Sequence, residues 1–350
     1  MHSNALSFLA CPRCGHTLSP VDPIGKKEEI TRGILACEKG CGQYPIQNGV
    51  PVLLPERCRQ KYDAADLQEP TRDRFSAEWN MYRYGETTWG VTVDERVPVV
   101  LHELNWSKED LAGKVILDAG CGNGTLSHAL VTLGANIVAL DLSSGVFRAQ
   151  QHCTHENLHF VQGNLYFPPL RHNMFDAIYS CGVFHHTPDT RKCFDALLPV
   201  LKNEKESRYF VWLYSKRSAL FNYTVEPIMK LTRRLPPEVV VPLCYALAPI
   251  VEAGSRTVTA LGIEKYGRRT LRDRAIQNHD LLAPTFVWYY DFAEAQTWAR
   301  QAGFETIEQT DYQPQHNGLS PNTQKLLDKY RSICRPGFGI FCKGPRTAMS

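Results

Sequence analysis

The sequence has no uninterrupted apolar run of the roughly 18 residues that a transmembrane helix needs. The apolar stretch 239–251 is shorter than that, and we expect Pro242 and Pro249 to break it. The first residues also lack the basic start and apolar core of a secretory signal peptide. We therefore expect a cytoplasmic protein with no membrane span.

Charge of one sign is also missing, since 39 basic and 36 acidic residues leave a net charge of only +3. Nothing in this balance demands a nucleic-acid partner. Charged residues make up 21% of the chain and hydrophobic residues 43%, which excludes a disordered chain. Internal repeats and low-complexity segments are not evident. A length of 350 residues allows two unequal folded parts.

The twelve cysteines would indicate disulfides in a small secreted domain, but four of them form two pairs near the N-terminus. Cys11 and Cys14 lie on a Pro/Gly turn, as in a zinc knuckle, and Cys37 and Cys41 form the second pair. Residues 30–36 between them alternate like a strand. We predict a closed, structural zinc site of four thiolates. The alternative is four free cysteines in an ordinary core.

The stretch 115–125 is the most informative one. Apolar residues lead into Asp118 and then into Gly120, Gly122 and Gly124. This pattern predicts a buried strand that ends in a tight turn at the start of a helix, where a small ligand can lie on the backbone. A dinucleotide fingerprint has its third glycine one position later, where this chain has a threonine.

Further buried strands are predicted at 136–141, 158–162, 175–180 and 208–214. The first of them ends in Asp141, whose carboxylate is suited to accept hydrogen bonds from both hydroxyls of a ribose. The second is followed by Asn164 and Leu165, and the amide oxygen of Asn164 is a possible acceptor for an amino group.

The strand 175–180 leads into a loop that contains His185 and His186. Thr187 as N-cap and Pro188 at the first helical position predict that the next helix begins here. An imidazole is the natural base at neutral pH, which makes both histidines candidate catalytic residues. The alternative is that one of the pair packs or caps the loop.

The D-x-G-x-G-x-G form of 118–124 resembles motif I of class I methyltransferases that depend on S-adenosylmethionine (SAM). The loop 181–189 resembles the loop after strand four in the superfamily that includes the ubiquinone and menaquinone C-methylating enzymes. The resemblance implies SAM as cofactor and a set of residues that bind it: Asp118, Gly120, Cys121, Gly122, Asp141, Leu142, Asn164, Leu165 and Ser180.

Residues 6–56 resemble the small zinc-binding activator subunit that partners tRNA, rRNA and release-factor methyltransferases. The second cysteine pair departs from that pattern, because three residues separate Cys37 from Cys41 where two are usual. A domain of this size buries little core, and metal binding would supply much of its folding free energy.

Together these features predict an α/β protein with a Rossmann-like, seven-stranded class I methyltransferase domain, a helical insertion and a small N-terminal zinc ribbon. The last strand, 338–342, is expected to be antiparallel. The aromatic-rich segment 75–89 is either a lid over the cofactor or a hydrophobic anchor. The expected layout is a zinc ribbon at 1–57, a linker with lid helices at 58–110, a SAM-binding core at 111–214, a helical lid at 215–284 and the completion of the core at 285–350.

The implied function is methyl transfer from SAM to an oxygen or carbon of a small-molecule metabolite. A tRNA- or rRNA-modifying methyltransferase with a built-in activator is the alternative, but the small net charge and the apolar insertion make nucleic acid the less expected partner. Ser180 is followed by Cys-Gly-Val, where enzymes that methylate amide or adenine nitrogens have an Asn/Asp-Pro-Pro-aromatic loop. A scaffold without catalysis is disfavoured by the intact glycines and Asp141.

Overall fold

The structure is a computed structural model that describes residues 1–26, 28–55, 68–82, 87, 91–217, 222–223, 225–260, 270–310 and 337–346. Most of the expected linker, 58–67, lies outside the described residues. The same holds for most of the aromatic-rich segment beyond Tyr82, including Tyr84 and Trp89.

The centre of the molecule is a sheet with the strand order β7-β6-β5-β8-β9-β11-β10. Its first five strands are parallel and almost fully buried, as their continuous apolar runs predict. β11 lies antiparallel between β9 and β10, so the expected seven-stranded sheet with an antiparallel last strand is confirmed. The strands are β5 (Val115–Ala119), β6 (Asn136–Asp141), β7 (Leu158–Gly163), β8 (Ala177–Cys181), β9 (Arg208–Tyr214), β10 (Thr306–Thr310) and β11 (Gly337–Lys343).

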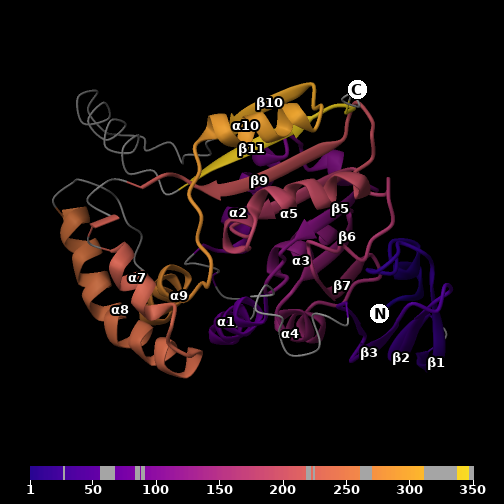
Figure 1. The fold of residues 1–350 in the computed structure, drawn as a ribbon, viewed down its shortest axis with the longest axis horizontal. Helices are drawn as coiled ribbons and strands as arrows, with labels where there is room; N and C mark the ends of the chain where they lie inside the picture. Colours follow the sequence, from indigo (N-terminus) through magenta and orange to yellow (C-terminus); the bar gives the residue numbers. More distant parts are fainter. Residues whose placement is uncertain are drawn as a thin grey trace.

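Helices cover both faces of this sheet (Figure 1). They are α2 (Val93–Glu103), α3 (Thr125–Thr132), α4 (Gly145–His152), α5 (Thr190–Leu197) and α10 (Phe292–Gln301). The predicted start of α5 was wrong, because its N-cap is Asp189, whose carboxylate accepts from the Lys192 N–H at 3.0 Å. Thr187 instead donates its hydroxyl to the Phe184 carbonyl and closes a 3-10 turn, Phe184–His186.

The N-terminal part is a short 3-10 turn, Ser3–Ser7, and a four-stranded antiparallel meander. Its last strand pairs parallel with β7 of the core, Val52 opposite Gln162 and Leu53 opposite Gly163, which makes a single sheet of 11 strands. The meander therefore adds to the edge of the central sheet. Its strands are β1 (Leu18–Lys26), β2 (Glu29–Cys37), β3 (Gln43–Gln47) and β4 (Val50–Leu53).

On the opposite side of the molecule from this meander lie the helices of the insertion, α7 (Glu226–Thr232), α8 (Pro237–Ala260) and α9 (Leu271–Leu282) (Figure 1). We expected Pro242 and Pro249 to break the apolar run, but α8 continues through both. Both prolines are exposed, so the backbone carbonyls that lose a helical partner can bond to water. α1 (Gln68–Met81) lies between the insertion and the core.

The expectation of no membrane span needs qualification at α8. Pro237–Thr257 is long and apolar enough, by length and composition alone, to cross a membrane. Our expectation counted only the uninterrupted run and left out the small and weakly polar residues after it. Only 22% of the most apolar window of this helix is buried inside the molecule.

Candidate functional site

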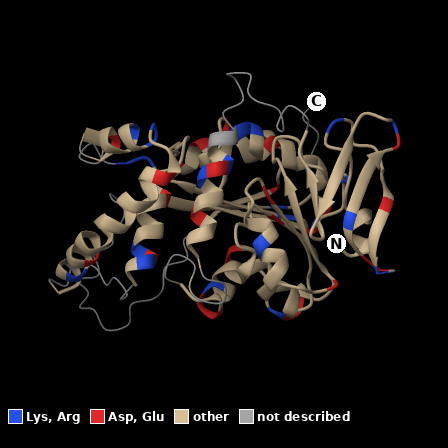
Figure 2. Cartoon of the chain, turned by 90° about the horizontal axis from the view of Figure 1, so that it is seen from below, with Lys and Arg blue, Asp and Glu red and all other residues tan. Residues whose placement is uncertain are grey.

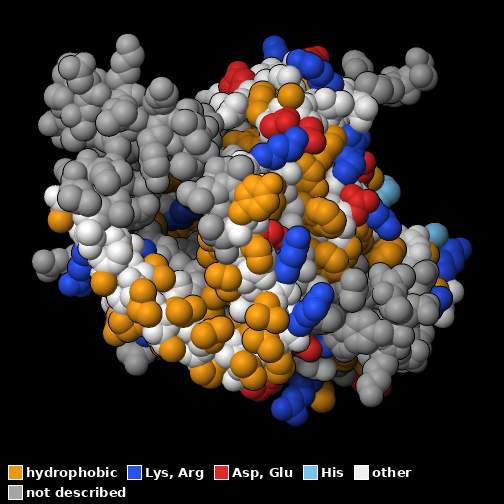
Figure 3. Space-filling model, turned by 60° about the vertical axis from the view of Figure 1, so that its left-hand side comes forward, with side chains coloured by type: hydrophobic (Ala, Val, Ile, Leu, Met, Phe, Trp, Pro, Cys, Tyr) orange, Lys and Arg blue, Asp and Glu red, His pale blue; other side chains and the backbone are white. Residues whose placement is uncertain are grey.

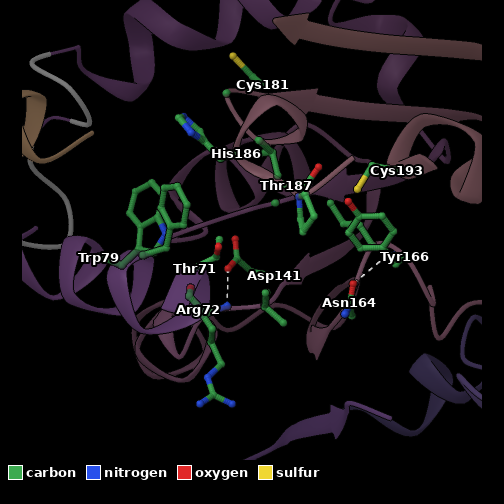
Figure 4. A pocket seen from close by; sticks show the side chains of 18 of the residues that line it. Thr71, Arg72, Trp79, Asp141, Asn164, Tyr166, Cys181, His186, Thr187 and Cys193 are labelled. Atoms are coloured by element: carbon green, nitrogen blue, oxygen red, sulfur yellow. Dashed lines mark hydrogen bonds between the residues drawn. The ribbon is translucent and has the colours of Figure 1, made fainter. Parts of the chain in front are cut away.

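A pocket with about 800 Å³ of space between atoms, part of it open to solvent, lies at the carboxyl ends of β5, β6, β7 and β8. This is where open α/β sheets bind ligands, because the strand order reverses between β5 and β8. Five of the residues predicted to bind SAM line it: Gly120, Asp141, Leu142, Asn164 and Leu165. Figure 4 shows Asp141 near the middle, with Trp79 and His186 on one side and Tyr166 with Asn164 on the other.

The carboxylate of Asp141 is held in place by the backbone at the end of β6. Its Oδ2 accepts from the Gly122 N–H at 2.8 Å and its Oδ1 from the Ser143 N–H at 2.7 Å. Each carboxylate oxygen has further acceptor capacity beyond one such bond. Asp141 is thus fixed in orientation and still suited to accept hydroxyl groups from a ligand in the pocket.

The glycine turn after β5 has no space for side chains. Gly120 and Gly122 have φ values of +89° and +56°, in the left-handed region. An added Cβ at Gly122 would lie 2.3 Å from Cζ2 of Trp79, and one at Gly120 would lie 2.3 Å from Cγ2 of Val183. Trp79 and Val183 therefore pack closely against the turn, and Gly120 is its one residue in the lining of the pocket.

Asp118, Cys121, Gly122 and Ser180 do not line the pocket and support its floor instead. Asp118 accepts a hydrogen bond from the Ser127 hydroxyl at the start of α3, and burial raises the pKa of its carboxyl to about 6. Ser180 donates its hydroxyl to the Ala119 carbonyl at 2.8 Å and so links β8 to β5. The side-chain oxygen of Asn164 accepts a hydrogen bond from the Tyr166 N–H at 2.9 Å, which stabilises the turn after β7.

The roof of the pocket is α1, which contributes Thr71, Arg72, Phe75 and Trp79. Arg74 on the same helix is buried and donates to the carbonyls of Ala283, Arg233 and Leu235 at 2.6, 2.6 and 2.9 Å. These bonds attach α1 to the ends of α7 and α9. Of the two alternatives for the aromatic segment, Trp79 therefore favours the lid over the ligand site rather than the hydrophobic anchor.

His186 lines the pocket and has a defined proton arrangement. Its Nδ1 lies 3.0 Å from the Phe286 carbonyl, and because a carbonyl only accepts, Nδ1 carries the proton. Nε2 has no hydrogen-bond partner within the described residues and lies 3.9 Å from Oδ1 of Asp280. Tyr214 donates its hydroxyl to Oδ2 of Asp280 at 2.7 Å. Burial holds the pKa of His186 below its usual value, so the ring is neutral.

His185 points elsewhere, although it is the adjacent residue. Its ring stacks on Tyr214 with centroids 3.9 Å apart, is fully buried and does not line the pocket. Burial lowers the pKa of His185 well below the ordinary value. The structure thus separates the pair into a pocket residue and a packing residue.

Several residues of the pocket were missed by the sequence analysis. Asp280 and Phe75 come from segments far from the motifs, and the Phe75 ring lies 5.4 Å from the His186 ring. Tyr166, Cys181 and Cys193 also line the pocket. Only the aromatic density around Trp79 signalled any of these contributions.

The four predicted zinc ligands come together at one end of the meander. The Sγ atoms of Cys11, Cys14, Cys37 and Cys41 all lie within 4.8 Å of one another. Sγ of Cys41 is 3.3 Å from that of Cys37 and 3.1 Å from that of Cys14. The extra residue of the second pair is accommodated by Gly40, whose φ of +67° tightens the turn.

Comparison with known proteins identifies the central part of the chain. Residues 117–205 match a family model described as a methyltransferase domain. A ubiquinone biosynthesis O-methyltransferase of Pseudomonas fluorescens is 31% identical over 106 residues, 27% of this chain and 46% of that relative. A sterol 24-C-methyltransferase of Gibberella zeae is 25% identical over 158 residues, 41% of each chain. The chain spans about half the length of these curated relatives.

Among solved structures, phosphoethanolamine N-methyltransferase 2 of Haemonchus contortus in complex with SAM is similar at 15% identity, with a TM-score of 0.48. The similarity covers 87% of this chain and 62% of that one. The glycine turn, Asp141 and the histidine loop all lie within the segment that matches the family model. The α/β core of this chain therefore has a methyltransferase fold, and its residues 117–205 match a methyltransferase domain.

Proposed function

We propose that the protein transfers the methyl group of SAM to an oxygen or carbon of a small-molecule acceptor. The observation that carries the proposal is that one pocket is lined by Asp141, Gly120 and His186, whose Nε2 has no hydrogen-bond partner among the described residues. Beyond Asp141, Asp280 and Arg72, its lining is uncharged. Such a lining suits an apolar-bodied acceptor better than a polyanion.

The residues present fit SAM. Asp141 has acceptor capacity for ribose hydroxyls, and Gly120 lines the pocket without a side chain that would fill it. Bound SAM would supply an electrophilic methyl group on sulfur. The task of the protein is then mainly to hold the acceptor atom in line and to exclude water.

His186 is the proposed base, because it lines the pocket and its Nε2 has a lone pair with no hydrogen-bond partner among the described residues. Asp280 lies 3.9 Å from that atom and would stabilise the imidazolium that forms when the ring takes a proton from the acceptor. Phe75 packs against the same ring and shields it from solvent. His185 would hold the loop rather than take part in proton transfer.

SAM binding tests the cofactor half of the proposal. Isothermal titration should show SAM binding to the wild-type protein, and Asp141→Ala should weaken it at least about tenfold because the ribose acceptor is lost. Asp94→Ala, an exposed carboxylate on α2, is the matched control and should bind normally. Equal binding by the wild type and Asp141→Ala would show that the site is elsewhere.

The base is tested by methyl transfer from labelled SAM into a metabolite extract. His186→Ala should lower the rate about 100-fold or more with SAM affinity unchanged. His186→Gln should be equally slow although it keeps the size of the side chain. A rate within a few-fold of wild type for both variants would show that His186 is not a base and that the enzyme acts by positioning the acceptor alone.

The RNA alternative makes a different prediction. On the described elements, acidic and basic side chains are mixed rather than collected on one face (Figure 2). We expect no labelled methyl group in total tRNA or rRNA, and only weak RNA binding that falls with salt. Robust incorporation into either RNA would replace the small-molecule proposal.

We also propose that the four cysteines hold one structural zinc ion. A tetrahedral site with Zn–S bonds of about 2.3 Å has sulfurs about 3.8 Å apart. Sulfur separations such as the 3.4 Å between Cys11 and Cys41 and the 3.5 Å between Cys14 and Cys37 are close to this geometry. Metal analysis of protein prepared without chelators should find close to one zinc per chain, and Cys11→Ser with Cys14→Ser should remove it.

A further inference from the structure

The insertion exposes an apolar surface that a water-soluble helix pair does not normally have. Large apolar side chains on α7 and α8 are open to solvent, including Leu231 at 63%, Val239 at 48% and Ile250 at 68% exposure. Ile228, Tyr245 and Val251 extend the same surface. Figure 3 shows these hydrophobic side chains gathered over this part of the molecule. We call the exposed apolar side chains of α7 and α8 the insertion face.

The other side of α8 is already occupied, so the insertion face is not a core surface that has been turned outward. Val240, Cys244 and Ala248 pack against α9 in a separate hydrophobic cluster. Asn278 donates to the Cys244 carbonyl at 3.0 Å, and Arg274 pairs with Glu252 at 2.7 Å in a buried position. α8 is therefore fixed on one side and apolar on the other. A helix that is apolar all round is covered on all sides when it functions.

Charge next to the insertion face indicates what covers it. Lys230 and Arg234 flank Leu231 on the exposed side of α7 and its C-terminal turn, and no ion pair is found for either among the described residues. Glu238 is the exposed acid nearby in sequence, and Arg256 at the far end is paired with Glu252 at 2.8 Å. An apolar face with unpaired cations at its edge is complementary to the surface of an anionic lipid bilayer.

The attachment to α9 also determines how α8 meets the lipid. A spanning helix would have to leave the Asn278 and Arg274 contacts, whereas a helix that lies in the interface keeps them. Pro242 and Pro249 lie on the exposed side and leave carbonyls without helical partners, which the headgroup region can hydrate and the hydrocarbon core does not. We propose that the insertion face docks the protein on anionic phospholipid membranes, with α8 parallel to the surface.

Docking there would bring the pocket next to the lipid. Arg74 of the pocket roof bonds to the carbonyls of Arg233 and Leu235 at the end of α7, and Asp280 of the pocket belongs to α9. The helices that carry the insertion face are thus attached to α1 and α9, which supply residues of the pocket. An acceptor with an apolar body dissolved in the bilayer would be delivered to the side of the pocket that α1 and α9 form.

The test is flotation of the full-length protein with vesicles of phosphatidylcholine alone and of phosphatidylcholine with phosphatidylglycerol. We expect binding to the anionic vesicles that decreases as salt rises. Leu231→Ser with Val239→Ser and Ile250→Ser should weaken it at least about tenfold, because the apolar contact is lost. Ile24→Ser, at a 62% exposed position in β1, is the matched control and should bind like wild type.

A second variant keeps the test sharp if the triple variant folds poorly. Lys230→Gln with Arg234→Gln should weaken binding to the anionic vesicles at least about fivefold and leave binding to phosphatidylcholine unchanged. The melting shift caused by SAM should stay as in wild type in both variants, which reports an intact fold. Absence of vesicle binding, or binding that neither variant reduces, would overturn the proposal. A dimer that is seen in sedimentation velocity and lost in the triple variant would also overturn the proposal. The insertion face would then bind a second copy of the chain instead of a membrane.

Discussion

Gly122 shows how tightly single residues are specified at the cofactor site. Its backbone has φ of +56°, and a methyl group there would lie 2.3 Å from the Trp79 ring. Gly122→Ala has to displace the indole from the roof of the pocket as well as adopt a left-handed backbone. We expect SAM affinity to fall at least about tenfold, measured by titration calorimetry.

Gly113→Ala is the matched control for this variant. Gly113 has φ of +73°, but no atom lies within 4 Å of its Cβ position. It bears the same backbone strain without the clash and should lower stability by about 1 kcal/mol with SAM affinity unchanged. Equal loss of affinity in both variants would attribute the effect to general destabilisation.

The residues of the site were predictable where local chemistry determines them. Asp141 and the glycine turn could each be predicted, because each lies at the end of a buried strand that is recognisable from the neighbouring residues in the chain. Asp280 was not predictable, because only the packing of α9 brings it beside His186. Phe75 was predicted only as part of the aromatic segment 75–89, without its contact to His186. The separation of His185 from His186 likewise depends on Tyr214, which β9 supplies.

His159 should make stability depend on pH. It is buried on β7 beside Phe8, and burial lowers its pKa to about 4. Because the unfolded state, with a pKa of about 6.5, binds the proton more tightly, the unfolding free energy is highest above that pH and falls as pH decreases towards 4. In His159→Phe, the unfolding free energy measured by urea unfolding should fall less steeply with decreasing pH, by up to about 1.4 kcal/mol per pH unit. The exposed His172→Phe should keep the wild-type slope.

At the scale of elements, α1 depends on the insertion for its position over the pocket. Arg74 satisfies three carbonyls at the ends of α7 and α9. Arg74→Ala leaves them without these donors, at a cost of about 1–3 kcal/mol for each buried group that stays unsatisfied. We expect faster amide hydrogen exchange in residues 68–82 and weaker SAM binding. Arg300→Ala on α10 should change neither, and unchanged exchange in 68–82 would show that α1 is held by its apolar contacts alone.

The insertion also shows why some elements escape prediction. Proline lacks the N–H that continues a helix, so Pro242 and Pro249 locally indicate a break. α8 continues because its packed side is fixed by α9 and its two prolines face outward. Tertiary contacts made by a partner helix thus override the local signal, and those contacts are not encoded near the prolines.

At the scale of the whole molecule, the ribbon-like meander and the core are parts of one structure. Leu35 and Leu53 of the meander, with Leu9 just before it, share a buried cluster with Leu140 and Phe175 of the core. The Ala10 N–H donates to the Pro169 carbonyl at 2.9 Å, and the Arg171 N–H to the Phe8 carbonyl at 2.8 Å. The sequence indicated the four cysteines and one strand between them, but the pairing of β4 with β7 joins residues too distant for any local pattern.

This continuity predicts how loss of the metal would affect the protein. Cys11 follows Ala10 directly, so the proposed zinc site lies next to the backbone contacts that hold the segment 163–171. Cys11→Ser with Cys14→Ser should therefore lower the melting temperature of the whole protein in one calorimetric transition, by several degrees. SAM should also bind more weakly, because Gly163 opposite Leu53 directly precedes Asn164 in the pocket. If the meander were an independent domain, an early small transition would appear and the main transition, with its SAM-induced shift, would stay at the wild-type temperature.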